Sequence, residues 1–161
     1  GGATTSQWMK LNRHEVCFQG NGNRYGHFVN YVRAGLVAGI KLEYLSGEIR
    51  CVGLVEYNSR WGCANYAPFA KMPLDVIVTD NNDQVLYPSK RYHKNHPGLW
   101  YWLPFVNTKT SNNLIFTDYS KPFYFPLNSQ MRVWYGEDLK NWAETDNQGH
   151  ICVNVYAKFM L

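Results

Sequence analysis

Apolar and polar residues alternate with a period of two in many short runs along this chain. Such alternation indicates β-strands, because successive side chains of a strand point to opposite faces of a sheet. No window of eleven residues places apolar side chains at the spacing of an amphipathic helix. The pattern predicts strands at residues 29–33, 37–44, 49–56, 74–78, 99–103, 114–117, 131–135 and 151–158.

Turn-forming residues separate these runs, at Ser46-Gly47, at 80–83, at Pro97-Gly98 and at Asn112-Asn113. Long irregular segments at 58–72, 87–97 and 138–149 interrupt the alternation, and loops of this length usually carry function. We therefore predict an all-β fold, an antiparallel β-sandwich of jelly-roll type with long functional loops. The length of 161 residues fits one domain covering 1–161.

Two runs predict buried strands in more detail. In 49–56, Cys51, Gly53 and Val55 share one face, and the other face is also apolar, as in a central strand of a sandwich. In 99–103, the alternation places Trp100 and Trp102 on the same face.

The composition excludes two classes of partner. The net charge is +4, but the lysines and arginines are scattered singly, which is too weak a pattern to indicate nucleic acid. The longest apolar stretch, residues 34–40, is far shorter than the ~20 residues that span a bilayer, so we expect no membrane insertion. The chain begins with Gly1 instead of Met, which suits a mature secreted protein and predicts an extracellular location.

The four cysteines contain no C-x-x-C pair, which favours disulfides over zinc, with free buried thiols as the alternative. Three pairings are possible. We favour Cys51 with Cys152, because both lie in the middle of predicted strands among apolar neighbours. Cys17 and Cys63 would then pair with each other or across a homodimer.

Catalytic motifs are absent: the sequence has no G-x-S-x-G elbow, no H-E-x-x-H and no P-loop. Its five histidines are scattered, and Pro97 argues against a helix that would bring His93 and His96 together. A glycosidase needs two carboxylates on opposite sides of the sugar, and the sequence does not show which acidic residues of this chain would lie in that way. We expect that the protein is not an enzyme.

Acidic side chains crowd into one segment near the C-terminus. Glu137, Asp138, Glu144 and Asp146, together with Asn147, lie within eleven residues of a net basic chain. Carboxylates packed this closely raise each other's pKa unless a cation lies between them. Ca²⁺ prefers carboxylate, amide and carbonyl oxygens, so the segment predicts a calcium loop, although it lacks the EF-hand register. The alternative is a solvated turn.

A calcium ion with open coordination positions can bind the vicinal diol of a sugar, and the same acids and amides can hydrogen-bond its hydroxyls. An aromatic ring can pack on the apolar face of galactose. Tyr57, Trp61 and Trp142 lie in or beside the predicted loops and are the candidates for this ring. Each could equally be a core residue or a loop anchor.

Three segments carry a resemblance to a known family: VGLVEYNSRWGC at 52–63, RVWYGEDL at 132–139 and DNQGHICV at 146–153. They resemble a group of cnidarian proteins that includes a calcium-dependent, galactose-specific lectin of sea anemones. The C-terminal part is more remotely similar to a galactose-binding bacterial lectin, in which Ca²⁺ lies between an aromatic-x-Asp element and an Asn-Asn-x-Gly element. The resemblance implies a lectin for galactose-containing glycans such as lactose and other β-galactosides.

Carried onto this chain, the bacterial Asn-Asn-x-Gly falls on Asp146-Asn147-Gln148-Gly149, and the bacterial Asp falls on Asp138 or Glu137. The resemblance therefore implies a calcium cofactor bound by Glu137, Asp138, Asp146 and Asn147. Sugar contacts would come from Asp138, Glu144, Asp146 and Asn147. The loop is longer here, which leaves open whether Glu144 contacts metal or sugar. A calcium-stabilised structural or adhesive module without a sugar site is the alternative.

Overall fold

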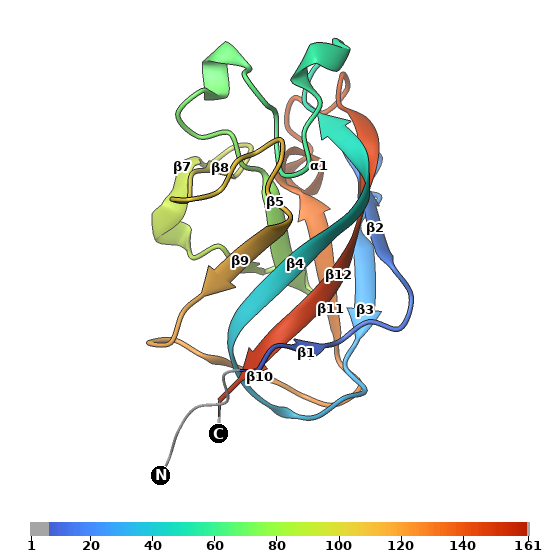
Figure 1. Ribbon diagram of the computed structural model, residues 1–161, viewed down its shortest axis with the longest axis vertical. Helices are drawn as coiled ribbons and strands as arrows, with labels where there is room; N and C mark the ends of the chain where they lie inside the picture. The colour runs from blue at the N-terminus through green and yellow to red at the C-terminus, as the bar shows by residue number, and fades with distance from the viewer. Residues whose placement is uncertain (1–6, 161) are drawn as a thin grey trace.

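The computed structural model describes residues 7–160 as two antiparallel sheets that pack face to face (Figure 1). The strands are β1 (Met9–Lys10), β2 (Val16–Gln19), β3 (Gly26–Val29), β4 (Gly35–Arg50), β5 (Val76–Asp80), β6 (Val85–Tyr87), β7 (His93–Asn95), β8 (Trp100–Tyr101), β9 (Asn113–Thr117), β10 (Phe123–Phe125), β11 (Gln130–Tyr135) and β12 (Gln148–Phe159). The helical elements are 3-10 turns at Val55–Tyr57, Ala67–Phe69 and Lys90–Tyr92 and one short helix, α1 (Gly136–Lys140).

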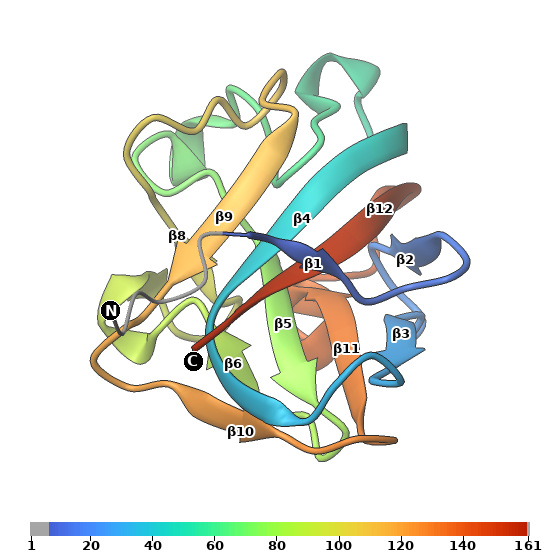
Figure 2. The same ribbon diagram turned by 60° about the horizontal axis from the view of Figure 1, so that its bottom comes forward.

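The larger sheet is organised around β4 and β12, its two longest strands, which run side by side (Figure 1). On one side of this pair, β1 and β2 add to β12; on the other side, β9 and β10 add to β4 (Figure 2). The smaller sheet has the order β3-β11-β5-β6, and β7 pairs with β8 in a separate ribbon.

The core fills the space between the sheets. Ile40 and Leu42 of β4 and Val155 of β12 have no exposed surface, and neither do Val78 of β5 and Val133 of β11. Apolar burial of this kind is the main force that holds two sheets together. The predicted antiparallel β-sandwich is confirmed. In the part of the chain that the structure describes, no helix is long and apolar enough to cross a membrane.

The long strand β4 differs from the prediction at Ser46-Gly47, where a turn was expected. The strand continues, and the pairing with β12 shifts register beside these residues. Gly47 has φ 96°, and a Cβ there would lie 2.2 Å from the carbonyl oxygen of His150. Glycine therefore permits a bulge between closely spaced strands, not a reversal of the chain.

The predicted strand at 49–56 is wrong beyond Arg50, where β4 ends. Leu54 and Val55 are 61% and 70% exposed, on a loop that the Cys51–Cys63 disulfide closes. The prediction for Trp102 is also wrong: Trp100 and Tyr101 are both buried, while Trp102 is 51% exposed, because β8 ends after two residues.

Several short strands were not predicted, among them β2, β6 and β10, because three or four residues show too little alternation. The segment predicted at 29–33 forms its strand earlier, as β3. The turn at 80–83 is confirmed as the β5–β6 hairpin, where the Asp80 amide donates to Gln84 at 3.0 Å. The turn at Pro97-Gly98 lies between β7 and β8.

Two disulfides are present, which confirms disulfide formation but not the favoured pairing. Cys17 of β2 lies directly opposite Cys152 of β12, with 4.1 Å between their Cα atoms, and forms the first bond. Cys51 pairs with Cys63, 12 residues away, at a Cα distance of 5.6 Å. Strand β2 was not predicted, so the true neighbour of Cys152 was missed.

Candidate metal and sugar site

The acidic segment begins on α1, which follows β11 without a loop (Figure 1). The carboxyl group of Asp75 fixes the start of this helix. Asp75 Oδ2 accepts a hydrogen bond from the Glu137 amide at 3.1 Å, and the Asp75 carbonyl accepts one from Gly136 at 2.7 Å. A Cβ on Gly136 would come within 2.6 Å of the Gly98 carbonyl oxygen, so only glycine fits here.

Helix α1 buries two of its acids, since Glu137 is 2% exposed and Asp138 has no exposed surface. The two carboxylate oxygens of Asp138 accept hydrogen bonds from the backbone N–H groups of Asn23 and Arg24, at 2.8 and 3.0 Å. Asp138 therefore ties the glycine-rich loop between β2 and β3 to the helix. A carboxylate that accepts backbone amides in this way is held in one orientation.

Asn147 connects a third segment to the same place. Its side-chain amide donates to the Gly20 carbonyl at 2.8 Å, and its own carbonyl accepts from the Asn21 side chain at 2.8 Å. A Cβ on Gly20 would lie 2.9 Å from Cβ of Asn147, which shows how closely the chains approach. The Asn147 amide donates to the Glu144 carbonyl at 3.0 Å and closes the loop after α1.

Four buried oxygen atoms in this region accept no hydrogen bond within residues 7–160: Oδ1 of Asp75, Oε1 of Glu137, Oε2 of Glu144 and Oδ1 of Asn147. A buried acceptor without a donor costs free energy, and most proteins avoid it. Carboxylate and amide oxygens are the ligands that Ca²⁺ prefers. The donor set therefore fits a hard divalent cation.

The pKa values of the acids show how strongly their charges are crowded. Burial, the largest cause, and the charges of Asp146 and Glu144 raise the pKa of Glu137 to about 7, although a 3.0 Å hydrogen bond from the Trp100 indole opposes the rise. Burial and the neighbouring Asp138 raise the pKa of Glu144 to about 7 as well. Without a cation, these carboxyl groups hold protons near neutral pH.

Carboxylates alone do not complete a cation site here. Among residues 7–160, the group of three acidic, histidine or cysteine ligand atoms within 4.8 Å of one another is Glu15 with Cys17 and Cys152. Both cysteines are in a disulfide, so this group cannot bind a metal through thiolates. An ion at α1 needs the amide oxygen of Asn147 or backbone carbonyls in addition to carboxylates.

The structure brings Glu137, Asp138, Glu144 and Asn147 together, with Asp146 exposed at the rim. Trp142 also belongs to this region: Asn141 ends α1 with φ 51°, and the Trp142 amide then donates to the Glu137 carbonyl at 3.0 Å. Its ring is 36% exposed and packs beside Gly98.

The other two aromatic candidates are more buried than Trp142. Trp61 has no exposed surface, and its indole N–H donates to the Ser111 carbonyl at 2.7 Å. It is a core residue and cannot present its ring to a sugar, which corrects the prediction. Tyr57 is partly buried and packs edge to face on Tyr66 at 5.3 Å.

The sequence did not reveal Asp75 and Trp100, which form hydrogen bonds with the backbone amide and the carboxylate of Glu137 respectively. Asp75 is 62 residues from Glu137 in the chain, so no local spacing could indicate the contact. The glycine-rich segment was recognised only as a loop. Its glycines were the available signal, because glycine often marks the close approach of two backbones.

Comparison with known proteins identifies the family of the chain. No protein-family model matches the chain, and no curated protein matches it. The structure is similar to a solved lectin structure, AJLec from the sea anemone Anthopleura japonica, with a TM-score of 0.86 and 35% sequence identity. The match covers 95% of this chain and 97% of that chain. The chain therefore belongs to the cnidarian lectin family, a class of carbohydrate-binding proteins and not of enzymes.

Proposed function

We propose that this lectin binds galactose and β-galactosides through a calcium ion held in the loops around α1. The buried oxygens of Glu137, Glu144 and Asn147, which accept no hydrogen bond within residues 7–160, support the proposal most directly. Lectin-family membership and the resemblance of the 132–139 and 146–153 segments point in the same direction.

Each residue has a distinct part in this proposal. Glu137 and Asn147 contribute ligands from the buried side, and Glu144 contributes one from the loop. Asp146 is exposed at the surface of the site, where it can ligate the ion or accept a hydrogen bond from a sugar hydroxyl. Asp138 already accepts two backbone amides, so its main role is to position the 20–24 loop. The bound ion would supply open coordination positions for the 3,4-diol of galactose.

Trp142 is the aromatic residue best placed to pack on the sugar. Its backbone amide donates a hydrogen bond to the Glu137 carbonyl, and the residue remains 36% exposed. Galactose that presents its axial 4-hydroxyl to the ion leaves an apolar face for such a ring. Mannose would present hydroxyl groups there, so we propose that it binds poorly.

The two disulfides support an extracellular site of action, because disulfides persist in oxidising compartments. A secreted lectin also meets galactose-containing glycans where they are displayed.

Thermal unfolding with lactose tests the proposal. A ligand raises the unfolding midpoint only if it binds the folded state. Lactose should raise the midpoint in calcium and not in excess chelator. A lactose effect that survives chelation would contradict the bridging role of the ion. If calcium alone raises the unfolding midpoint and lactose adds nothing, the alternative is favoured: a structural or adhesive module in which calcium only stabilises the fold.

A further inference from the structure

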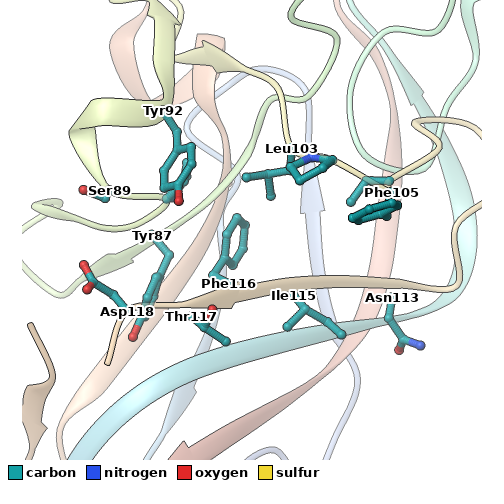
Figure 3. A pocket seen from close by; sticks show the side chains of 13 residues that line it. Tyr87, Ser89, Tyr92, Leu103, Phe105, Asn113, Ile115, Phe116, Thr117 and Asp118 are labelled. Carbon is teal, nitrogen blue, oxygen red and sulfur yellow. The ribbon is translucent and has the colours of Figure 1, made fainter. Parts of the chain in front are cut away.

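A hollow lies beside β9, which within residues 7–160 pairs only with β4 and is therefore an edge strand of the larger sheet. It has a volume of about 330 Å³, within the range of small-ligand sites. The segment after β6, the 103–106 loop and β9 form its walls (Figure 3). The acids around α1 are not among the residues that line it.

One end of this groove is apolar and open. Phe105 is fully exposed and has φ 63°, a backbone conformation that is rare for an aromatic residue. Ile115 of β9 is 45% exposed and lies next to it along the groove (Figure 3). The loop thus holds a large apolar ring in solvent beside a second apolar side chain. A bound apolar group would remove both surfaces from water.

The other end of the groove is polar. Tyr87, Ser89 and Asp118 gather there (Figure 3). Tyr87 is 3% exposed, and its hydroxyl has no hydrogen-bond partner within residues 7–160. Burial and the charge of Asp118 raise the pKa of this hydroxyl, so it stays protonated.

Asp118 brings a negative charge to this end. Its carboxylate accepts one hydrogen bond, from the Ser120 hydroxyl at 2.9 Å. The ion pair found in the described part of the chain joins Arg132 to Asp83, so Asp118 has no cationic partner there. Lys90 and Lys121 line an adjoining hollow that shares Tyr87, Ser89 and Asp118 with the groove, but in the described part of the chain neither lysine forms an ion pair with Asp118.

We propose that this groove binds a small organic cation, an ammonium group attached to an apolar ring, without calcium and apart from the sugar site. The ammonium group pairs with Asp118, which forms no ion pair within residues 7–160. The ring packs between Phe105, Ile115 and the buried floor formed by Phe116. Tyr92 also lines the groove and adds ring surface to it, while the Arg91 guanidinium lies over the Tyr92 ring, 5.1 Å from the centroid.

The test compares 2-phenylethylamine with 2-phenylethanol, two probes that differ only in the ammonium and hydroxyl groups. Each is titrated at pH 7 in chelator into uniformly ¹⁵N-labelled protein, with amide shifts as the readout. Both probes should shift amides at 87–92, 103–106 and 113–118 and leave Glu137 and Asn147 unchanged. The amine should bind at least about fivefold more tightly, as a charge-assisted hydrogen bond to a carboxylate implies.

Two variants separate the charge from the apolar wall. Asp118→Asn keeps the shape of the side chain and should reduce the preference for the amine to within about twofold, while binding of the alcohol is kept. Phe105→Ala changes a fully exposed side chain and should weaken both probes severalfold. Glu56→Gln, an exposed acid outside the groove, is the matched control and should change neither.

The proposal is overturned by shifts that map elsewhere, by no shifts at all, by equal affinity for the two probes, or by an Asp118→Asn protein that still prefers the amine. If methyl β-galactoside shifts the same amide signals in the presence of chelator, the proposal is also overturned, because the groove would then be a second saccharide site.

Discussion

The Glu137 backbone amide donates a hydrogen bond of 3.1 Å to Asp75, a carboxyl group with no exposed surface. Burial raises the pKa of Asp75 well above its ordinary value, and the charge of Glu137 raises it further. The raised pKa favours the neutral form of this carboxyl group. Asp75 supports the proposed site by accepting the hydrogen bond of the Glu137 amide.

Asp75→Asn should leave the free energy of unfolding within about 1 kcal/mol of the unchanged protein, because an amide keeps the shape and the acceptor oxygen of a carboxyl group whose raised pKa favours the neutral form. Asp75→Ala should cost about 2–4 kcal/mol, since the Glu137 amide loses its acceptor and a cavity forms. Urea unfolding measures both. If the two variants lose equal stability, the buried group acts through its charge.

Removing one carboxylate near α1 should weaken calcium binding strongly while the fold is kept. Glu137→Gln and Glu144→Gln each delete an anionic ligand without changing shape, and calcium affinity depends on ligand charge. We expect a loss of at least about tenfold in calorimetric titration. The exposed Glu56→Gln serves as the matched control. Unchanged affinity in both variants would place the ion elsewhere.

The sequence predicted the sandwich because its long strands repeat the alternation over many residues. In β12, the buried residues Val153, Val155 and Ala157 follow one another at every second position. The acidic segment was found because its members are close in sequence. Asp75 and the 20–24 loop were not, because only the pairing of β5 with β11 and of β2 with β12 brings them to α1.

The two disulfides should contribute unequally to stability. Cys17–Cys152 closes a loop of 135 residues and Cys51–Cys63 one of 12, and loop-closure entropy grows with the logarithm of length. The paired replacement Cys17→Ser with Cys152→Ser should cost about 1–2 kcal/mol more than Cys51→Ser with Cys63→Ser. Urea midpoints of the two double variants decide this, and the reverse order would contradict the entropic account.

His93 should make the protein less stable as the solution becomes acidic. Burial, together with the smaller effects of His96 and Lys90, lowers the pKa of His93 from 6.5 to about 4. Between these two values the unfolded chain binds more protons, so this contribution to stability falls as the pH drops from 6.5 to 4. His93→Phe keeps a ring beside Tyr101, which lies 6.2 Å away.

The measured quantity is the difference in unfolding free energy between His93→Phe and the unchanged protein at each pH. The raised pKa of Glu137 acts in the opposite direction, but it is common to both proteins and cancels. The variant should gain relative stability steadily from pH 6.5 to pH 4. A difference that does not change with pH would show that His93 titrates normally.

Trp142 and Trp102 provide a matched test of the sugar platform, because both are partly exposed tryptophans, at 36% and 51%. Only Trp142 adjoins Glu137 through a backbone hydrogen bond. Trp142→Ala should weaken lactose binding severalfold, as the loss of an aromatic contact worth about 0.5–1.5 kcal/mol implies, and leave calcium affinity unchanged. Trp102→Ala should change neither. Competition with lactose, methyl galactoside and mannose on immobilised galactose provides the readout, and equal inhibition by mannose would contradict the galactose assignment even if calcium binds at α1.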